Sequence, residues 1–244
     1  MKLITLPFAG GSAANYINWK PYLNQAIDLV PIELAGRGRR INEPLYADIN
    51  EMTEDVFQIV KKEIIDDEYV IFGHSMGALL AYELVHKIKK NNFSLPIHIF
   101  FSGRYAPNTY MAEDKILHNL PYEEFKKEIL EMGGTTSEIF EHPELTRLFL
   151  PVLRNDIKIA ETYQFINSRT PHDCDFSILI GKEEDYTIEQ LAGWRKLTSG
   201  RCEFHRFEGG HFFIHEEREK VVELVNEKAA SLKLQAPRIK TTNY

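Results

Sequence analysis

The stretch that decides the fold is Tyr69-Val70-Ile71-Phe72-Gly73-His74-Ser75-Met76-Gly77. Its first four residues are apolar, as in a buried strand, and a helical pattern follows from Ala78 to Lys90. Ser75 therefore lies in a G-x-S-x-G turn between a strand and a helix, the setting of a nucleophile elbow. The flanking glycines permit a turn that is too tight for side chains. We predict that Ser75 is a nucleophile; the alternative is a serine that only caps the helix.

Short apolar runs alternate with helical patterns along most of the chain. This alternation predicts a mostly parallel sheet with helices on both faces. The expected strands cover residues 3–6, 28–33, 69–72, 97–102, 176–180 and 202–207. One expected helix carries Met52, Val56 and Val60 on one face, and a last helix carries Val221 and Val225. Combined with the elbow, the pattern predicts an α/β-hydrolase fold that forms a single domain over residues 1–244.

Residues 104–169 break the alternation, because helical patterns follow one another there without a convincing strand. One helix is expected to begin at Pro121 and to end at Gly133-Gly134, and another is expected over 143–155. The segment lies between two expected sheet strands. We therefore predict a helical insertion above the carboxyl edge of the sheet, where it would act as a lid. The alternative is a set of extra helices that only enlarges the core.

A serine nucleophile needs a base, and the base needs an acid that orients it. In this fold the chain order is nucleophile, acid, histidine. Among the nine histidines, His211 has the expected position, because it follows Glu208-Gly209-Gly210 after a strand and precedes the last helix. The glycines allow the backbone to bend toward the serine. We predict that His211 is the base; the alternative is an ordinary surface-loop histidine.

The acid is expected in the loop after the strand 176–180, which contains Glu183, Glu184 and Asp185 in a row. Only one carboxylate can accept the hydrogen bond from the second ring nitrogen of His211. We predict Asp185, since aspartate is the usual residue and its spacing to His211 is suitable, with Glu184 as the second choice. A third possibility is that all three carboxylates are solvated and the acid comes from elsewhere.

Acyl transfer also needs two N–H donors for the oxyanion of the tetrahedral intermediate. One is expected to be the amide of Met76, at the start of a helix whose dipole favours negative charge. The second is expected in the loop after the first strand, at the Ala9 amide, with Phe8 as the alternative. The neighbouring Gly10-Gly11 pair can also be explained as a plain tight turn.

Composition limits the partners and the compartment. The 244 residues carry a formal net charge of −7, which argues against nucleic acid as a general partner. Cys174 and Cys202 lack the spacing of metal ligands and favour a reduced compartment. The apolar start of the chain is too short for a signal peptide, and no run reaches the ~18 residues of a membrane span. We expect a cytoplasmic protein without a membrane segment, and a monomer.

Together, these motifs resemble the type II thioesterases, which edit nonribosomal peptide and polyketide assembly lines. The resemblance covers nearly the whole chain and rests on an ordered set of motifs. The set consists of Leu6-Pro7-Phe8-Ala9-Gly10-Gly11, Glu33-Leu34-Ala35-Gly36-Arg37-Gly38-Arg39-Arg40, the GHSMG elbow, Leu120-Pro121 with Phe125 and Gly133-Gly134, Phe149-Leu150-Pro151-Val152-Leu153-Arg154-Asn155-Asp156, and Gly209-Gly210-His211-Phe212-Phe213. The chain departs from the family pattern at Ala35 and at Thr135-Thr136, where proline is common, and its match around the acid loop is weak.

The resemblance implies hydrolysis of acyl groups from the phosphopantetheine thiol of carrier proteins, without a metal or an organic cofactor. Carrier proteins are usually acidic near this arm, so Arg37, Arg39, Arg40 and Arg154 are candidates for a docking surface, or simply solvated side chains. Three alternatives remain at this stage: a carboxylesterase or lipase acting on free esters, an acyltransferase, and a carrier-binding protein without activity. The order serine, acid, histidine argues against the acyltransferase, and the complete set of candidate residues argues against an inactive protein.

Overall fold

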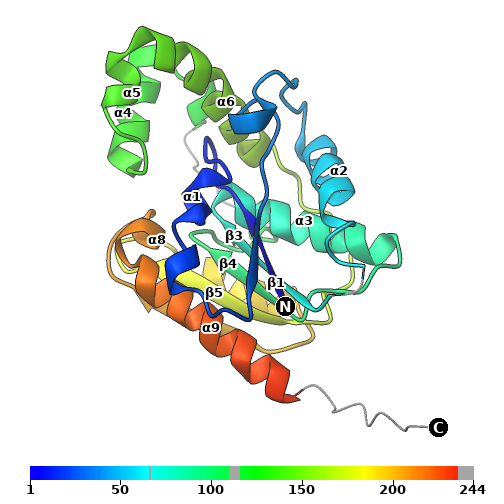
Figure 1. The fold of residues 1–244 in the computed structure, drawn as a ribbon. Coiled ribbons are helices and arrows are strands. Elements are labelled where there is room, and N and C mark those ends of the chain that lie inside the picture. The colour runs from blue at the N-terminus through cyan, green and yellow to red at the C-terminus, as the bar shows by residue number, and fades with distance from the viewer. Residues whose placement is uncertain (66, 110–115, 236–244) are drawn as a thin grey trace, which may run out of the picture.

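The computed structural model describes residues 1–65, 67–109 and 116–235. Within them, six strands form one sheet in the order β2-β1-β3-β4-β5-β6, and every neighbouring pair is parallel (Figure 1). The strands are β1 (Lys2–Leu6), β2 (Asp28–Pro31), β3 (Tyr69–His74), β4 (His98–Ser102), β5 (Asp175–Gly181) and β6 (Cys202–Phe207). All six coincide with strands predicted from the sequence. The carboxyl ends of the strands therefore lie along one edge of the sheet, as a nucleophile elbow requires.

Helices cover both faces of the sheet because successive strand residues point to opposite sides. Val70 and Phe72 pack in one apolar cluster with Val225, whereas Ile71 packs in the other with Met52 and other buried residues. Figure 1 shows α2 (Ile49–Val60) and α3 (Met76–Lys90) on one face, and α1 (Ala14–Ile17), α8 (Phe213–Glu216) and α9 (Arg218–Gln235) on the other. The described helices and strands form the two-faced arrangement that the sequence predicts.

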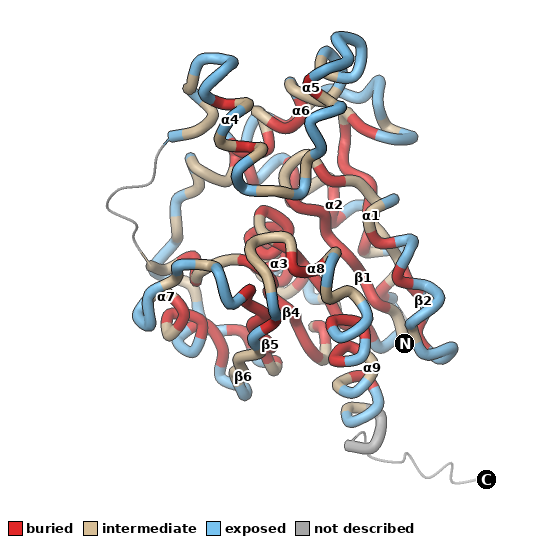
Figure 2. Tube along the Cα trace, turned by 90° about the vertical axis from the view of Figure 1, so that its left-hand side faces the viewer, coloured by how far each residue is buried: buried red, intermediate tan, exposed pale blue. Residues whose placement is uncertain are grey.

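Between β4 and β5, the described residues form three α-helices and a short 3₁₀ helix (Leu117–Asn119), in the segment where the sequence predicts a helical insertion. The α-helices are α4 (Tyr122–Met132), α5 (Glu138–Glu141) and α6 (Pro143–Glu161), and they sit together above the carboxyl edge of the sheet (Figures 1 and 2). They enclose a small apolar cluster of their own, which includes Phe125, Ile129 and Phe140. We call residues 104–169 the insertion. The segment between β5 and β6 contains the short helix α7 (Ile188–Ala192).

The strand ends differ from the predicted ends in two informative places. β2 stops at Pro31 rather than at Glu33, although the Ile32 N–H still donates to the Thr5 carbonyl oxygen of β1 at 3.0 Å. β3 extends through Gly73 to His74, so the strand runs directly into the elbow. Residues 238–244 are polar, which predicts a loose tail, and they lie outside the described residues. In the described parts of the chain, every helix is too short or too polar to cross a lipid bilayer.

Candidate active site

Ser75 lies at the junction of β3 and α3, in a backbone conformation that side chains rarely adopt. Its φ is 54° and its ψ is −115°. A Cβ atom at Gly73 would lie 2.1 Å from the Gly77 carbonyl oxygen, and one at Gly77 would lie 2.2 Å from the Leu6 carbonyl oxygen. The Ser75 N–H donates to the Ser102 carbonyl oxygen at 2.8 Å. Such a conformation costs about 1–3 kcal/mol and persists only where its surroundings impose it, as the tight glycine contacts do here.

His211 pairs with a buried carboxylate. Its Nδ1 lies 2.7 Å from Oε1 of Glu184, whose side chain is only 5% exposed. A carboxylate at Nδ1 favours the tautomer with the proton on that nitrogen, which leaves Nε2 as a proton acceptor. His211 and Ser75 both line one cavity. The pair therefore has the chemistry of a general base and the group that orients it.

Two further donors hold the Glu184 carboxylate. The Gly181 N–H donates to Oε2 at 2.9 Å, and the Tyr186 hydroxyl donates to Oε1 at 2.8 Å. Burial, together with the nearby Glu184 charge, raises the pKa of Tyr186 well above its ordinary value. Tyr186 therefore stays protonated and remains a donor. Tyr186 was not among the residues predicted from the sequence, although a hydroxyl two residues after a candidate acid is a usable signal.

The prediction that Asp185 contacts His211 is wrong, because the carboxylate at that position belongs to Glu184. The chain turns after β5, with the Glu184 N–H donating to the Gly181 carbonyl oxygen at 3.2 Å. This turn folds the Glu184 side chain back toward the end of the strand and leaves the next residue, Asp185, exposed. The longer glutamate side chain reaches His211 from inside the turn. The second choice of the sequence analysis therefore makes the contact.

The loops that carry the acid and the histidine are hydrogen-bonded to each other. The Lys182 N–H donates to the Phe207 carbonyl oxygen at 2.8 Å, and the Glu183 N–H donates to the Gly209 carbonyl oxygen at 3.1 Å. Gly209 has a φ of +91°, which favours glycine, as expected for the bend before His211. A Cβ atom at Gly181 would lie only 2.4 Å from the Gly210 carbonyl oxygen. Close backbone contact thus fixes the separation of the two loops.

The amides predicted for the oxyanion, those of Ala9 and Met76, belong to residues that line the same cavity as Ser75. The next two amides of the first loop are occupied, since the Gly10 N–H donates to Asp156 and the Gly11 N–H donates to the Phe8 carbonyl oxygen. In contrast, the Ala9 and Met76 amides donate to no acceptor within the described parts of the chain. Both are therefore available to a ligand oxygen in the cavity, which is what an oxyanion site requires.

The cavity lies between the sheet edge and the insertion and has a volume of about 580 Å³. Most of its wall comes from the insertion, and apolar side chains dominate it. The apolar and aromatic lining residues include Phe8, Pro107, Ile116, Leu117, Ile129, Met132, Leu153, Ile157, Tyr163 and Phe212. A wall of this kind suits an acyl chain. In the described residues, no group of three or more histidine, cysteine, aspartate or glutamate side chains is arranged to hold a metal ion.

The His74 ring packs against the His211 ring. Its ring is fully buried, with its centroid 5.0 Å from that of His211, and its Nδ1 lies 2.9 Å from the Ser102 hydroxyl. Burial holds the pKa of His74 well below its ordinary value, so this ring stays neutral next to His211. Gly103 makes room for it, because a Cβ atom there would lie 2.4 Å from the His74 ring. His74 is thus a packing residue of the site.

Three of the four arginines considered for docking have partners within the protein. Arg37 is buried against Asp156, Arg40 pairs with Glu43 and Asp55, and Arg154 donates to the His118 and Leu120 carbonyl oxygens. Of the four arginines, Arg39 is exposed, Arg40 and Arg154 are partly buried, and Arg37 is buried. A basic docking surface made by all four side chains is therefore not present.

Comparison with known proteins identifies the family of the chain. A family model described as "Thioesterase domain" matches residues 1–229. The chain belongs to the thioesterase family. The resemblance to type II thioesterases and the α/β-hydrolase fold, both expected from the sequence, are thereby confirmed.

Three relatives illustrate the likeness. "Linear gramicidin dehydrogenase LgrE" of Brevibacillus parabrevis is 34% identical over 227 residues, which are 91% of this thioesterase and 85% of that protein. The crystal structure of ClbQ from the colibactin NRPS/PKS pathway has a TM-score of 0.90 and 35% identity, covering 96% of this chain and 98% of that one. The type II thioesterase BorB from the borrelidin biosynthetic cluster has a TM-score of 0.83 and 31% identity, covering 93% and 91%. The first name gives another activity, but the family model that matches this chain is that of a thioesterase.

Proposed function

We propose that this thioesterase hydrolyses acyl groups from the phosphopantetheine thiol of carrier proteins, with Ser75 as nucleophile, His211 as base and Glu184 as the acid that orients it. The observation that carries the proposal is the hydrogen bond of His211 to buried Glu184, beside a strained serine on the same cavity. The Ala9 and Met76 amides complete the set as oxyanion donors. The role predicted for Asp185 passes to Glu184.

The chemistry follows from these positions. The Ser75 Oγ attacks the thioester carbonyl carbon while His211 Nε2 takes the hydroxyl proton, and the oxyanion is held by the two amides. The C–S bond then breaks, and His211 passes the proton to the leaving thiolate, which departs as the thiol. Water attacks the acyl-serine with His211 again as base, which releases a carboxylic acid and restores Ser75. Glu184 stabilises the imidazolium in both halves of the cycle.

The substrate class is supported by the cavity and by the relatives. NRPS and PKS assembly lines hold their intermediates as thioesters. ClbQ comes from the colibactin NRPS/PKS pathway, and BorB is a type II thioesterase from the borrelidin biosynthetic cluster. The cavity wall contributed by the insertion can enclose an acyl chain and exclude water, which is the role of a lid. We therefore assign the enzyme to the removal of aberrant or stalled acyl units. We also propose that it acts as a cytoplasmic monomer; its two cysteines are free thiols, which suits a reduced compartment.

Intact mass spectrometry of an acyl-loaded carrier domain tests the proposal. The carrier should lose the mass of its acyl group when the enzyme is added and keep it when Ser75→Ala is added, a loss of at least about 10⁴-fold in rate. Simple esters of the same acyl group serve as the comparison. Faster turnover of the free esters would favour a carboxylesterase. Carrier binding without hydrolysis would favour an inactive binding module, and full activity of the folded Ser75→Ala variant would overturn the proposed nucleophile.

A further inference from the structure

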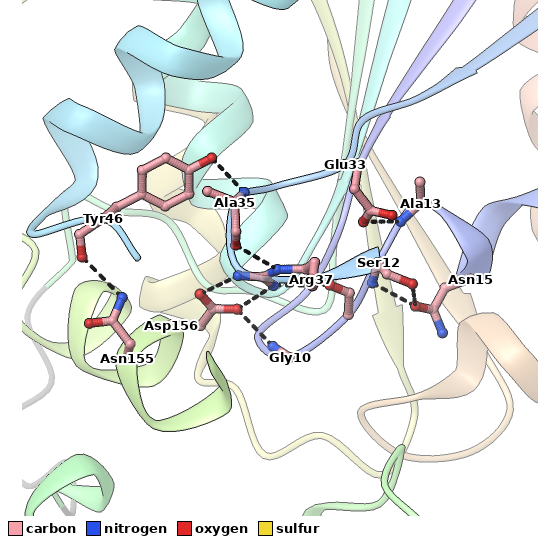
Figure 3. Close-up of polar contacts among 11 residues, drawn as sticks. Gly10, Ser12, Ala13, Asn15, Glu33, Ala35, Arg37, Tyr46, Asn155 and Asp156 are labelled. Carbon is pink, nitrogen blue, oxygen red and sulfur yellow. Dashed lines mark hydrogen bonds and ion pairs between the residues drawn. The ribbon is translucent and has the colours of Figure 1, made fainter. Parts of the chain in front are cut away.

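A buried ion pair lies next to the loop that carries Ala9. Arg37 Nη1 is 2.6 Å from Oδ2 of Asp156, and Nη2 is 2.8 Å from Oδ1, so the guanidinium and the carboxylate meet through two parallel hydrogen bonds (Figure 3). The Arg37 side chain is 7% exposed and the Asp156 side chain is fully buried. Arg37 comes from the segment after β2 and Asp156 from α6. The pair therefore joins the body of the enzyme to the insertion.

Both members of the pair also bind the loop after β1. The Gly10 N–H donates to Oδ2 of Asp156 at 2.8 Å, and Arg37 Nη1 donates to the Gly11 carbonyl oxygen at 3.0 Å. Figure 3 shows Asp156 between the Arg37 guanidinium and Gly10. Gly10 has a φ of +73°, which makes its conformation accessible mainly to glycine. The pair thus forms hydrogen bonds with both residues that directly follow Ala9.

Two further hydrogen bonds hold the same loop. The Gly11 N–H closes a turn within the loop onto the Phe8 carbonyl oxygen at 2.8 Å, and farther along the chain the Ala13 N–H donates to Oε1 of Glu33 at 3.1 Å. The Arg37–Asp156 pair joins this turn to α6. Loss of the pair would free the turn from α6 without releasing the whole loop.

The charges of the pair also matter to the reaction. Gly10, whose N–H binds Asp156, is the neighbour of the proposed oxyanion donor Ala9. A lone carboxylate there would oppose the negative charge that develops on the oxyanion, since Coulomb interactions are strong where water is excluded. The Arg37 guanidinium cancels that charge, so the carboxylate can orient the loop without this cost.

We infer that the Arg37–Asp156 pair positions the Ala9 amide so that its N–H points toward the oxyanion. The position of this donor then depends on the position of α6. A second contact fixes the same turn of α6, because Asn155 Nδ2 donates to the Tyr46 carbonyl oxygen at 3.0 Å (Figure 3). The inference rests on the proposed function, because it assigns the pair to an oxyanion site. Neither Arg37 nor Asp156 is a catalytic residue in this account.

Asp156→Asn and the double variant Arg37→Gln/Asp156→Asn test the inference, the second because it leaves no unpaired charge in the interior. The matched control is Asp55→Asn. Asp55 meets Arg40 through the same two-bond geometry, at 2.7 and 2.9 Å, and the other side-chain hydrogen bonds of that pair go to Glu33, Glu43 and Tyr46 rather than to residues 8–11. The readouts are kcat and KM for an acyl-pantetheine thioester, and the inhibition constant of an alkylboronic acid, whose adduct on Ser75 places an oxygen in the oxyanion site.

We expect kcat to fall by about 10-fold to 100-fold in both test variants, with KM nearly unchanged and the inhibition constant raised in parallel. The melting temperature and the fraction of active sites correct for any loss of folded protein. If both test variants fail to fold, Arg37→Lys is measured instead, since it keeps the charges paired but cannot bridge both carboxylate oxygens and Gly11.

A kcat equal to that of Asp55→Asn in the folded variants would overturn the inference, as would a rise in KM with kcat unchanged. Ser75→Ala is measured in the same assay. If Ser75→Ala is inactive but the pair variants are normal, only this inference fails. If Ser75→Ala is active, the proposed function itself fails.

Discussion

Two turns at the same edge of the sheet, the elbow Gly73–Gly77 and the acid turn Gly181–Tyr186, are built on different principles. The elbow is fixed by backbone contact, because a Cβ atom at either glycine would lie within about 2.2 Å of a carbonyl oxygen. In the acid turn, backbone contact constrains Gly181, whose Cβ atom would lie 2.4 Å from the Gly210 carbonyl oxygen, but the acid itself is held by hydrogen bonds between the Glu184 carboxylate and Gly181, Tyr186 and His211. A turn fixed by backbone contact dictates its sequence. Where side-chain hydrogen bonds hold the acid, the local sequence does not dictate which residue supplies the carboxylate.

The largest effect is expected at the elbow. In Gly77→Ala, the new methyl group would meet the backbone of Leu6 and Pro7, which cannot move without disturbing β1. We expect a destabilisation of more than about 3 kcal/mol, measured by urea unfolding. Gly210→Ala is the matched control, because its Cβ atom would meet nothing closer than 3.7 Å. Equal stability of the two variants would show that backbone contact does not fix the elbow.

In the acid turn, Glu184→Gln should lower kcat by about 10²-fold to 10⁴-fold and leave the fold intact. The amide loses the charge that stabilises the imidazolium and no longer fixes the tautomer of His211. Steady-state kinetics with a thioester substrate measure the change. Asp185→Asn is the control, since it makes the same chemical change at an exposed neighbour and should keep activity within about twofold. The reverse pattern would restore Asp185 as the acid.

A smaller effect is expected from Tyr186→Phe. This change removes one of the donors to Glu184 and leaves the Gly181 N–H in place. A hydrogen bond to a charged group contributes about 1.5–3 kcal/mol, part of which the remaining partners recover, so kcat should fall about 10-fold. The double variant Glu184→Gln/Tyr186→Phe should be no slower than Glu184→Gln alone. Additive losses would show that Tyr186 acts elsewhere.

The pH dependence of the free energy of unfolding distinguishes a loss of activity from a loss of folded protein. Burial lowers the pKa of His86 to about 4 and that of His172 to about 3, and their ring centroids are 4.0 Å apart. The folded protein keeps both rings neutral, whereas the unfolded chain protonates them below pH 6.5. Stability should therefore be unaffected above pH 6.5 and should fall by up to about 1.4 kcal/mol per pH unit for each ring, down toward pH 4.

Substitution checks the assignment of this acid sensitivity. His172→Phe should flatten the dependence of the free energy of unfolding on pH between 6.5 and 4, whereas His142→Gln, at an exposed site, should not. An unchanged slope in His172→Phe would mean that other groups govern acid unfolding. Kinetic measurements on the two turns are best made at pH 7 or above, where this effect is absent.

The sequence predicted the parts of the molecule that follow from periodicity and backbone sterics. The six strands, the elbow at Ser75 and the bend before His211 all leave a local pattern of apolar residues and glycines. The acid was assigned to Asp185 because three adjacent carboxylates look alike in sequence, and only the direction of the turn favours Glu184. The Arg37–Asp156 pair joins residues 119 positions apart, so no local pattern predicts it. Arginines that look solvated in sequence can be buried when a distant carboxylate meets them.

The most direct test is to trap the acyl-enzyme. The enzyme is mixed with an acyl-pantetheine thioester, quenched within milliseconds and digested, and the acylated peptide is identified by mass spectrometry. We predict one acyl group per chain, attached to Ser75, persisting longer in Glu184→Gln because His211 is then a poorer base for deacylation. An acyl group on another residue, or steady hydrolysis by folded Ser75→Ala, would contradict the account.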